Sequence, residues 1–242
     1  MRKTPKKLTQ KNPIKLQAKI HSKTKHTPLQ PLLTLDEIIT IFEIFKDLNP
    51  HPQTELKFNN LYQLLVAVAL SAQSTDISVN KATDILFQQI TTPMDMLNLG
   101  EDGLKQYIKS IGLYHTKAKN ILSLSRILIE QYNSQVPSTF SELIALPGVG
   151  HKTAKVVLNC GFGVPIIAVD THVFRVSQRL GIAYAKTPLE LEGKLLTAIP
   201  KKYHHDAHHW LILHGRYICK AQQPKCLECK LNTWCKYFNS SK

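Results

Sequence analysis

The sequence predicts an all-α fold. Apolar side chains recur at helical spacing through most of the 242 residues, and short stretches containing Gly, Pro or Asn separate the helical segments. The only extended run, residues 165–169, is too short to build a sheet. Aromatic residues make up only 7% of a chain that is 43% hydrophobic, so we expect aliphatic side chains to form the helix-packed core.

The predicted helices follow one another in order. Apolar residues from Leu35 to Leu48 keep an i, i+3, i+4, i+7 rhythm, and Pro50 ends this first helix. A second, almost wholly apolar helix begins at Leu61. Further helical stretches are predicted near residues 76–89, 103–109, 116–132, 141–146, 151–160, 171–180, 188–198 and 206–216.

Positive charge is concentrated at the N-terminus. The chain has 31 basic and 17 acidic residues, a formal net charge of +14, which favours a polyanionic partner: nucleic acid or an anionic membrane surface. Residues 1–35 hold nine of the basic residues, no acidic one and four prolines. Residues 1–32 are therefore predicted to be a basic disordered tail that adds non-specific phosphate affinity, and a solvated tail without a role is the alternative. No segment reaches the ~18 consecutive apolar residues of a membrane helix.

A helix-hairpin-helix is predicted at residues 139–160. Thr139 and Glu142 fit a capping box at the start of a short helix, and the turn Pro147-Gly148-Val149-Gly150 leads directly into the next helix. The glycines permit positive φ angles and leave the backbone bare. The first N–H groups of the second helix are unpaired at the positive end of its dipole, which suits a phosphate. A plain turn between two helices is the alternative.

Two side chains close to this hairpin could carry chemistry. Lys152 lies in the first turn of the second helix, where the dipole disfavours a cation and so favours the neutral amine that attacks electrophilic carbon. Asp170 directly precedes another helix, so it is a natural N-cap whose ionised carboxylate can stabilise positive charge or accept a proton from an amine. From position alone, a phosphate-contacting lysine and a purely structural cap are the simpler interpretations.

Four of the five cysteines cluster at the C-terminus: Cys219, Cys226, Cys229 and Cys235. Thiolates this close together suit a tetrahedral zinc ion or an iron–sulfur cluster, and the spacing alone does not distinguish the two. Cys160 stands apart in an apolar helix and is expected to be a small core residue.

In combination, these features resemble the endonuclease III family of the helix-hairpin-helix DNA glycosylases. The matching segments are LSAQSTD (70–76), IGLYHTKA (111–118), LPGVGHKTA (146–154), VDTHVFR (169–175), HHWLILHGRYIC (208–219) and the cysteine spacing. The resemblance runs from about residue 33 to the C-terminus. Any one motif is moderate evidence, but their joint order and spacing are specific.

The resemblance implies two helical domains that flank a DNA-binding cleft. One is a six-helix barrel at residues 54–164 that contains the hairpin. The other combines residues 33–53 and 165–242 and is closed by a [4Fe–4S] cluster on the four C-terminal cysteines. The implied activity is bifunctional, combining a DNA N-glycosylase that removes oxidised pyrimidines from duplex DNA with a lyase that cleaves the abasic site by β-elimination. By matching position, Lys152 is expected to be the Schiff-base nucleophile and Asp170 its carboxylate partner.

The same resemblance suggests how DNA is held. Gln73 resembles the residue that fills the gap left by a flipped base, and Leu113 resembles a wedge on the opposite strand; a turn residue and a core residue are the respective alternatives. His172 is expected to orient Asp170. Further residues expected to contact DNA are Gly148, Gly150, His172, Lys220 and Lys225.

The histidines between His204 and His214 include i, i+4 pairs that could bind zinc. No HExxH motif accompanies them, and their segment matches the family, so a structural role is expected.

Two other functions are weighed against this one. An adenine-mismatch glycosylase of the same superfamily shares the hairpin and the cluster, but it lacks a lysine at the position of Lys152 and usually carries a further C-terminal domain. A non-catalytic DNA-binding scaffold would have no need for both Lys152 and Asp170.

The expected partner is double-stranded DNA with damaged pyrimidines or abasic sites, bound by a monomer with no membrane association. The expected location is the bacterial cytoplasm at the nucleoid, or the nucleus or an organelle in a eukaryote.

Overall fold

The computed structural model describes residues 32–240, and its regular structure there is entirely helical, as predicted. The α-helices are α2 (Leu35–Leu48), α3 (Leu61–Ser71), α4 (Asp76–Leu86), α5 (Pro93–Ile108), α6 (Tyr114–Tyr132), α7 (Phe140–Ala145), α8 (His151–Phe162), α9 (Thr171–Leu180), α10 (Pro188–Ala198), α11 (His204–Tyr217) and α12 (Lys236–Asn239). A 3₁₀ turn at Lys201–Tyr203 precedes α11. The predicted basic tail, apart from its last residue, lies outside the described residues. None of the helices in residues 32–240 is long and apolar enough to cross a membrane.

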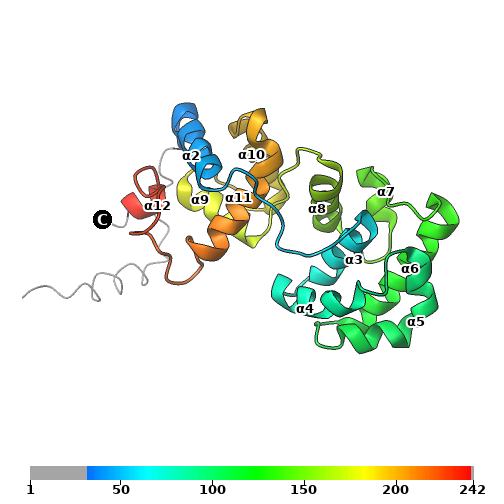
Figure 1. Ribbon diagram of the computed structural model, residues 1–242. Helices are drawn as coiled ribbons and strands as arrows, with labels where there is room; N and C mark the ends of the chain where they lie inside the picture. Colours follow the sequence, from blue (N-terminus) through cyan, green and yellow to red (C-terminus); the bar gives the residue numbers. More distant parts are fainter. Residues whose placement is uncertain (1–31, 241–242) are drawn as a thin grey trace, which may run out of the picture.

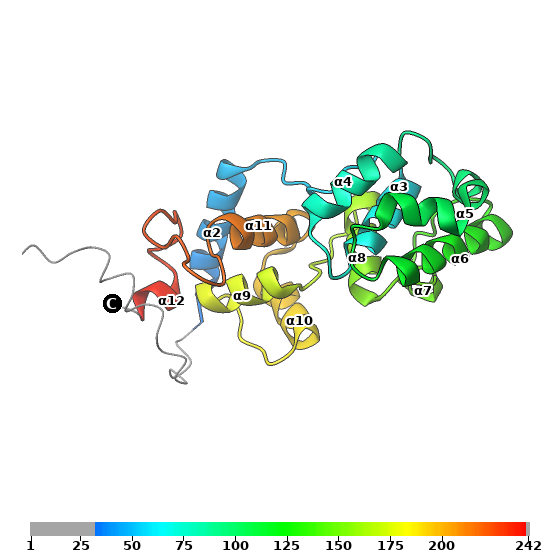
Figure 2. The ribbon, with the colours of Figure 1, turned by 90° about the horizontal axis from the view of Figure 1, so that it is seen from below.

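The helices form two groups with separate cores (Figures 1 and 2). Buried side chains of α3 to α8 make one core, centred on Leu64, Leu65 and Leu124. The other core unites α2 with α9, α10 and α11, where the Phe42 and Tyr203 rings stack with centroids 5.3 Å apart and planes inclined by 23°. Residues 49–60 and 163–170 connect the two groups, so the chain passes between them twice.

Most helices begin where a short polar side chain caps them. Thr34 and Glu37 form a reciprocal capping box at the start of α2, and Thr92 does the same with Asp95 at the start of α5, directly before Pro93. Each box satisfies N–H groups that have no partner within the helix. The polar punctuation in the sequence therefore sets where these helices start.

Two local expectations, at α5 and α7, need correction. Helix α5 begins at Pro93, ten residues before the predicted start, and Gly100 breaks it with a φ of 73°. The run at 165–169 joins no sheet, as expected from its length; the Asn159 side chain donates hydrogen bonds to Val164 O just before it and to Ile166 O within it. At α7, Thr139 accepts from the backbone of Glu142, but the carboxylate of Glu142 bonds the Thr139 hydroxyl rather than its backbone N–H.

An ion pair joins the two groups of helices. The Lys155 ammonium of α8 donates hydrogen bonds to both carboxylate oxygens of Glu192 in α10, each at 2.6 Å, and the two side chains are largely buried. A charge-assisted, bidentate contact of this kind restrains the angle between the elements that carry it. It therefore helps to hold α8 beside the second group.

Candidate active site

The hairpin turn presents an uncapped helix start to solvent. Gly148 adopts a φ of 79°, and Val149 buries its side chain and donates its N–H to Leu146 O at 3.1 Å. Gly150 is the N-cap of α8 and supplies no side-chain oxygen for the first N–H groups of the helix. These donors remain available to an anion at the positive end of the helix dipole.

Lys152 and Asp170 face one another across the junction of the two groups of helices. The Lys152 ammonium lies 3.7 Å from Asp170 Oδ2; the lysine side chain is 58% exposed and the aspartate side chain only 9% exposed. Asp170 Oδ1 accepts hydrogen bonds from His172 N and Val173 N, both at 2.8 Å, and so caps α9. One carboxylate oxygen is thus used for structure, and the other is directed at the amine.

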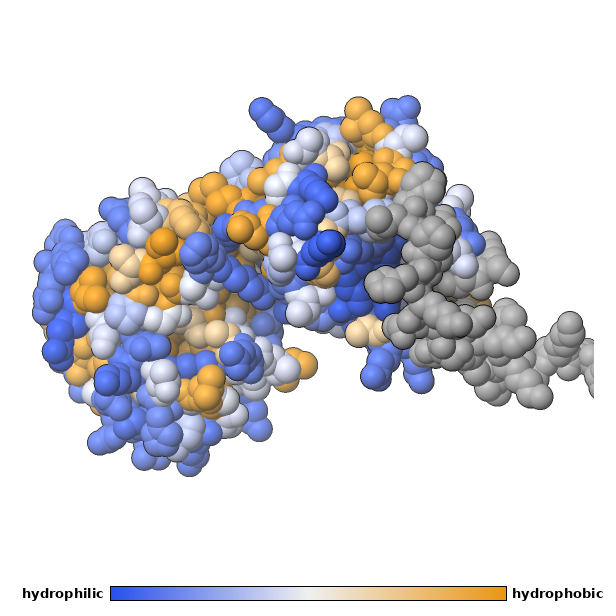
Figure 3. All heavy atoms as spheres, turned by 180° about the vertical axis from the view of Figure 1, so that it is seen from behind, coloured by the Kyte–Doolittle hydropathy of each residue, from blue (hydrophilic) through white to orange (hydrophobic). Residues whose placement is uncertain are grey.

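A cavity of about 310 Å³ opens beside this pair. Gln73, Lys152, Asp170 and His208 all contribute to its lining. Figure 3 shows the surface hollowed between the two lobes of the molecule. Such a cavity between two groups of helices could admit a flat ring while its attached chain remains outside.

The lining of this cavity also includes an ionic cluster that the sequence did not single out, together with one histidine of the His204–His214 segment. Arg216 of α11 pairs with Asp76 at 2.6 Å and with Glu55, whose carboxylate also accepts from the Tyr217 hydroxyl. His208 is almost fully buried, and burial lowers its pKa, which keeps the ring neutral. Asp76, His208 and Arg216 lie inside matching motifs, so motif membership was the available signal for them.

Gln73 and Leu113 share an unusual backbone conformation. Their φ angles are 56° and 59°, in the left-handed region that side chains with a Cβ rarely adopt. Both side chains are exposed, Leu113 at 62%. Such strain persists where the surrounding structure enforces it and is frequent at functional positions. Leu113 is therefore not the core residue that the alternative interpretation required.

The four C-terminal cysteines surround one small cavity. Cys219, Cys226, Cys229 and Cys235 line a space of about 20 Å³ together with apolar side chains that include Phe238. None of the four forms a disulfide bond. Burial raises the pKa of Cys226, Cys229 and Cys235, the last to about 11.

The four cysteines of this loop are suitable ligands for a metal centre, although their sulfur atoms are not arranged around a common metal position. Within residues 32–240, no group of three or more His, Cys, Asp or Glu side chains is arranged to hold a metal ion. Four sulfur donors around an apolar cavity are nevertheless the ligands that an iron–sulfur cluster uses. Arg179 secures the loop by donating to Lys220 O at 2.6 Å and Ala221 O at 3.0 Å.

The other residues predicted to contact DNA or to support the site, His172, Lys220 and Lys225, make no side-chain hydrogen bond or ion pair with Lys152 or Asp170 in the described structure. His172 contacts Asp170 through its backbone N–H, and its ring nitrogen Nδ1 lies 3.2 Å from Arg175 instead, so the side chain does not orient the carboxylate as expected. Lys220 and Lys225 are exposed on the cysteine loop, and Lys225 lies 3.8 Å from Glu228.

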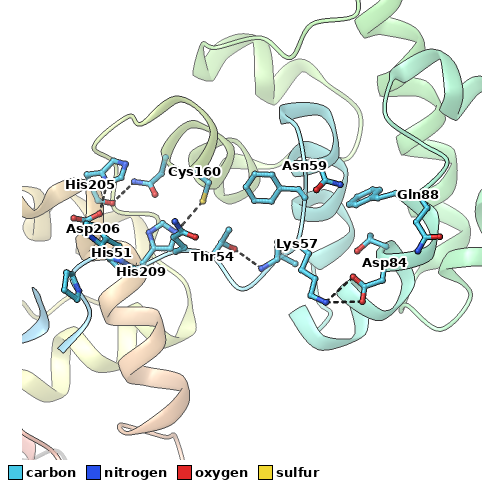
Figure 4. A pocket seen from close by; sticks show the side chains of 18 residues that line it. His51, Thr54, Lys57, Asn59, Asp84, Gln88, Cys160, His205, Asp206 and His209 are labelled. Carbon is cyan, nitrogen blue, oxygen red and sulfur yellow. Dashed lines mark hydrogen bonds and ion pairs between the residues drawn. The ribbon is translucent and has the colours of Figure 1, made fainter. Parts of the chain in front are cut away.

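A second cavity, of about 1060 Å³, lies against residues 50–59 (Figure 4). Cys160 Sγ is 3.5 Å from His209 Nε2 in its wall, and burial raises the pKa of Cys160 to about 12. This thiol is only partly buried, so it packs at the edge of the core rather than inside it.

Comparison with known proteins agrees with this geometry. The family model of the HhH-GPD superfamily base excision DNA repair proteins matches residues 66–201. Endonuclease III of Rickettsia felis is 60% identical over 200 residues, which cover 83% of this chain and 94% of that protein. A non-covalent endonuclease III–DNA complex superimposes with a TM-score of 0.80 at 46% identity, covering 86% of this chain and 98% of that one. A trapped endonuclease III–DNA covalent intermediate matches with the same TM-score and identity, covering 86% and 99%. The chain belongs to the HhH-GPD superfamily of base excision DNA repair proteins and, within it, to the endonuclease III family.

Proposed function

We propose that this protein is a bifunctional DNA glycosylase and abasic-site lyase of base excision repair, with Lys152 as nucleophile and Asp170 as its carboxylate partner. The observation that carries the proposal is the 3.7 Å approach of the Lys152 ammonium to Asp170 Oδ2 beside a cavity of about 310 Å³. The substrate class is duplex DNA that contains oxidised pyrimidines or abasic sites. The covalent DNA intermediate of a relative at 46% identity supports the same type of chemistry here.

The chemistry requires a base outside the helix. Extrusion costs a few kcal/mol, and the cavity beside Lys152 would receive the flipped base. The neutral amine attacks C1′, and the base leaves with the electron pair of the glycosidic bond and takes up a proton. Asp170 Oδ2 stabilises the positive charge that develops on the sugar and can accept a proton from the amine.

Strand cleavage follows from the covalent link. Opening of the sugar ring yields an imine between C1′ and Lys152, which makes the 2′ proton acidic. Loss of that proton expels the 3′ phosphate by β-elimination. Hydrolysis of the imine then releases Lys152 for another cycle.

Gln73 and Leu113 are proposed to occupy the space that the flipped base leaves. Their exposure and strained backbones support this role. The bare N–H groups at the start of α8, with Gly148 and Gly150, are proposed to hold a DNA phosphate. Lys220 and Lys225 would add phosphate contacts from the cysteine loop.

Cys219, Cys226, Cys229 and Cys235 are proposed to hold a [4Fe–4S] cluster. Four thiolates leave no open coordination position for substrate, so the cluster would stabilise the loop rather than take part in base removal. Iron and acid-labile sulfide analysis should find about four of each per chain. Stoichiometric zinc in a colourless protein would contradict this assignment.

The two cores are proposed to be two domains, residues 54–164 and residues 33–53 with 165–242. The support is that α3 to α8 share one core and that α2 shares the other with α9 to α11. We also propose a cytoplasmic location at the nucleoid, because the relative from Rickettsia felis is bacterial and DNA is the expected substrate.

Borohydride trapping tests the nucleophile. Incubation with abasic-site DNA and borohydride should yield a stable protein–DNA adduct, and Lys152→Ala should abolish it. Lys81→Ala removes an exposed lysine of α4 and serves as the control that should trap normally. Normal trapping by Lys152→Ala would refute the assignment.

A further inference from the structure

Lys117 of α6 is a buried cation whose position the proposed chemistry does not explain. Lys117 is only 8% exposed, and burial lowers the pKa of its ammonium group. Its ammonium is bonded to a carbonyl and a hydroxyl rather than to a carboxylate. Lysine is rarely buried without a charged partner, so these two contacts have to offset the loss of hydration.

The two contacts enclose the turn that carries Gln73. Lys117 Nζ donates to Leu70 O at 2.8 Å and to Ser74 Oγ at 2.9 Å. Leu70 lies in the last turn of α3, where carbonyl groups lack helical partners and a cation is favoured. The ammonium thus ties together the residues before and after the strained backbone of Gln73.

The backbone of Lys117 holds the second strained residue. Its N–H donates to Leu113 O at 3.0 Å and closes the first turn of α6. Leu113 has no side-chain cap of its own. Helices α3 and α6 also pack directly against each other, so a single residue connects the Gln73 turn to the Leu113 helix start.

We propose that Lys117 is a positioning residue that holds Gln73 and Leu113 in register with each other, so that both enter the DNA stack together. The inference rests on the proposed stack-filling role of these two residues. Lys117 itself would touch neither the base nor the reacting sugar.

The test compares Lys117→Met with Lys119→Met, which removes an exposed charge from the same helix. Single-turnover excision of thymine glycol from duplex DNA should fall about 10-fold in Lys117→Met, whereas cleavage of a preformed abasic site, which needs no base extrusion, should change by less than about 3-fold. DNA binding should change little, and Lys119→Met should match the wild type. Equal losses in both reactions, or no loss in excision, would overturn the proposal.

A double-mutant cycle identifies the route of the effect. Lys117→Met removes only the ammonium, which contacts the Gln73 turn, and keeps the backbone N–H that bonds Leu113 O, so it should add little to the loss already caused by Gln73→Ala. Full additivity would overturn the proposal. The fluorescence of a 2-aminopurine base placed opposite the lesion should also show that the base stack is held open less stably by Lys117→Met than by the wild type.

Ser74→Ala covers the case in which Lys117→Met fails to fold. It removes one of the two ammonium contacts and should lower excision in the same direction, with an unchanged thermal midpoint. Wild-type excision by Ser74→Ala would then overturn the proposal. If the wild-type protein itself neither excised bases nor trapped abasic DNA, the proposed function would fail instead, so the two failures are distinguishable.

Discussion

Replacing Asp170 by Asn separates the two roles of its carboxylate. Oδ1 caps α9 through two 2.8 Å hydrogen bonds, and Oδ2 lies 3.7 Å from the Lys152 ammonium. An asparagine oxygen can keep both cap bonds, so the folded state should lose less than about 0.5 kcal/mol. The negative charge beside the amine is removed.

The catalytic loss should be large by comparison. Loss of one preorganised electrostatic contact typically costs a factor of about 10²–10³, or roughly 3–4 kcal/mol, and the 9% exposure of this side chain leaves little solvent screening. We therefore expect Asp170→Asn to excise thymine glycol about 10²–10³-fold more slowly under single-turnover conditions. Its DNA affinity should stay close to that of the wild type.

Asp170→Ala provides the matched comparison because it removes both the charge and the cap. It should lose a further ~1 kcal/mol of stability and lower the melting temperature by about 2–4 °C. Calorimetry and single-turnover excision measure the two effects separately. Excision by Asp170→Asn at the wild-type rate would refute the reasoning and leave Asp170 as a structural cap alone.

Three further predictions concern stability. Gly148→Ala should lose about 1–3 kcal/mol in urea unfolding, because its φ of 79° is strained for alanine and the new Cβ would lie 2.9 Å from Asn120 Cβ; an unchanged midpoint would contradict this. Glu192→Gln should lose about 2–3 kcal/mol, at or just below the ~3–5 kcal/mol of a fully buried pair because the two side chains are 15% and 16% exposed, since Lys155 would keep an unpaired charge; a loss near zero would contradict this. His209 alone should contribute a loss of ~1–2 kcal/mol as the pH drops from 6.5 to 5, since burial lowers its pKa to about 4 and the unfolded chain takes up the proton first; His208 and His214, whose pKa values burial also lowers, add losses in the same direction, so pH-dependent urea unfolding of His209→Gln should show a correspondingly shallower fall than the wild type, and identical profiles would contradict this.

The sequence alone determined the features that depend on neighbouring residues. Helical periodicity, the Thr and Asp caps and the Pro-Gly-Val-Gly turn are local signals, so they identified the helices and the hairpin. The joint spacing of the motifs also identified the family, which the comparisons confirm. The local signals were incomplete at α5, where Thr92-Pro93 and Asp95 marked a start that apolar periodicity did not.

Only the tertiary structure decided which distant side chains meet. Periodicity cannot show that Lys152 and Asp170 lie 3.7 Å apart, or that one aspartate oxygen is used by the α9 cap while the other remains directed at the amine. It also gave no sign that Lys117 turns inward, because a lysine in a helix is usually solvated. These contacts join elements far apart in the chain, and they arise from the packing of whole helices rather than from the propensity of any one segment.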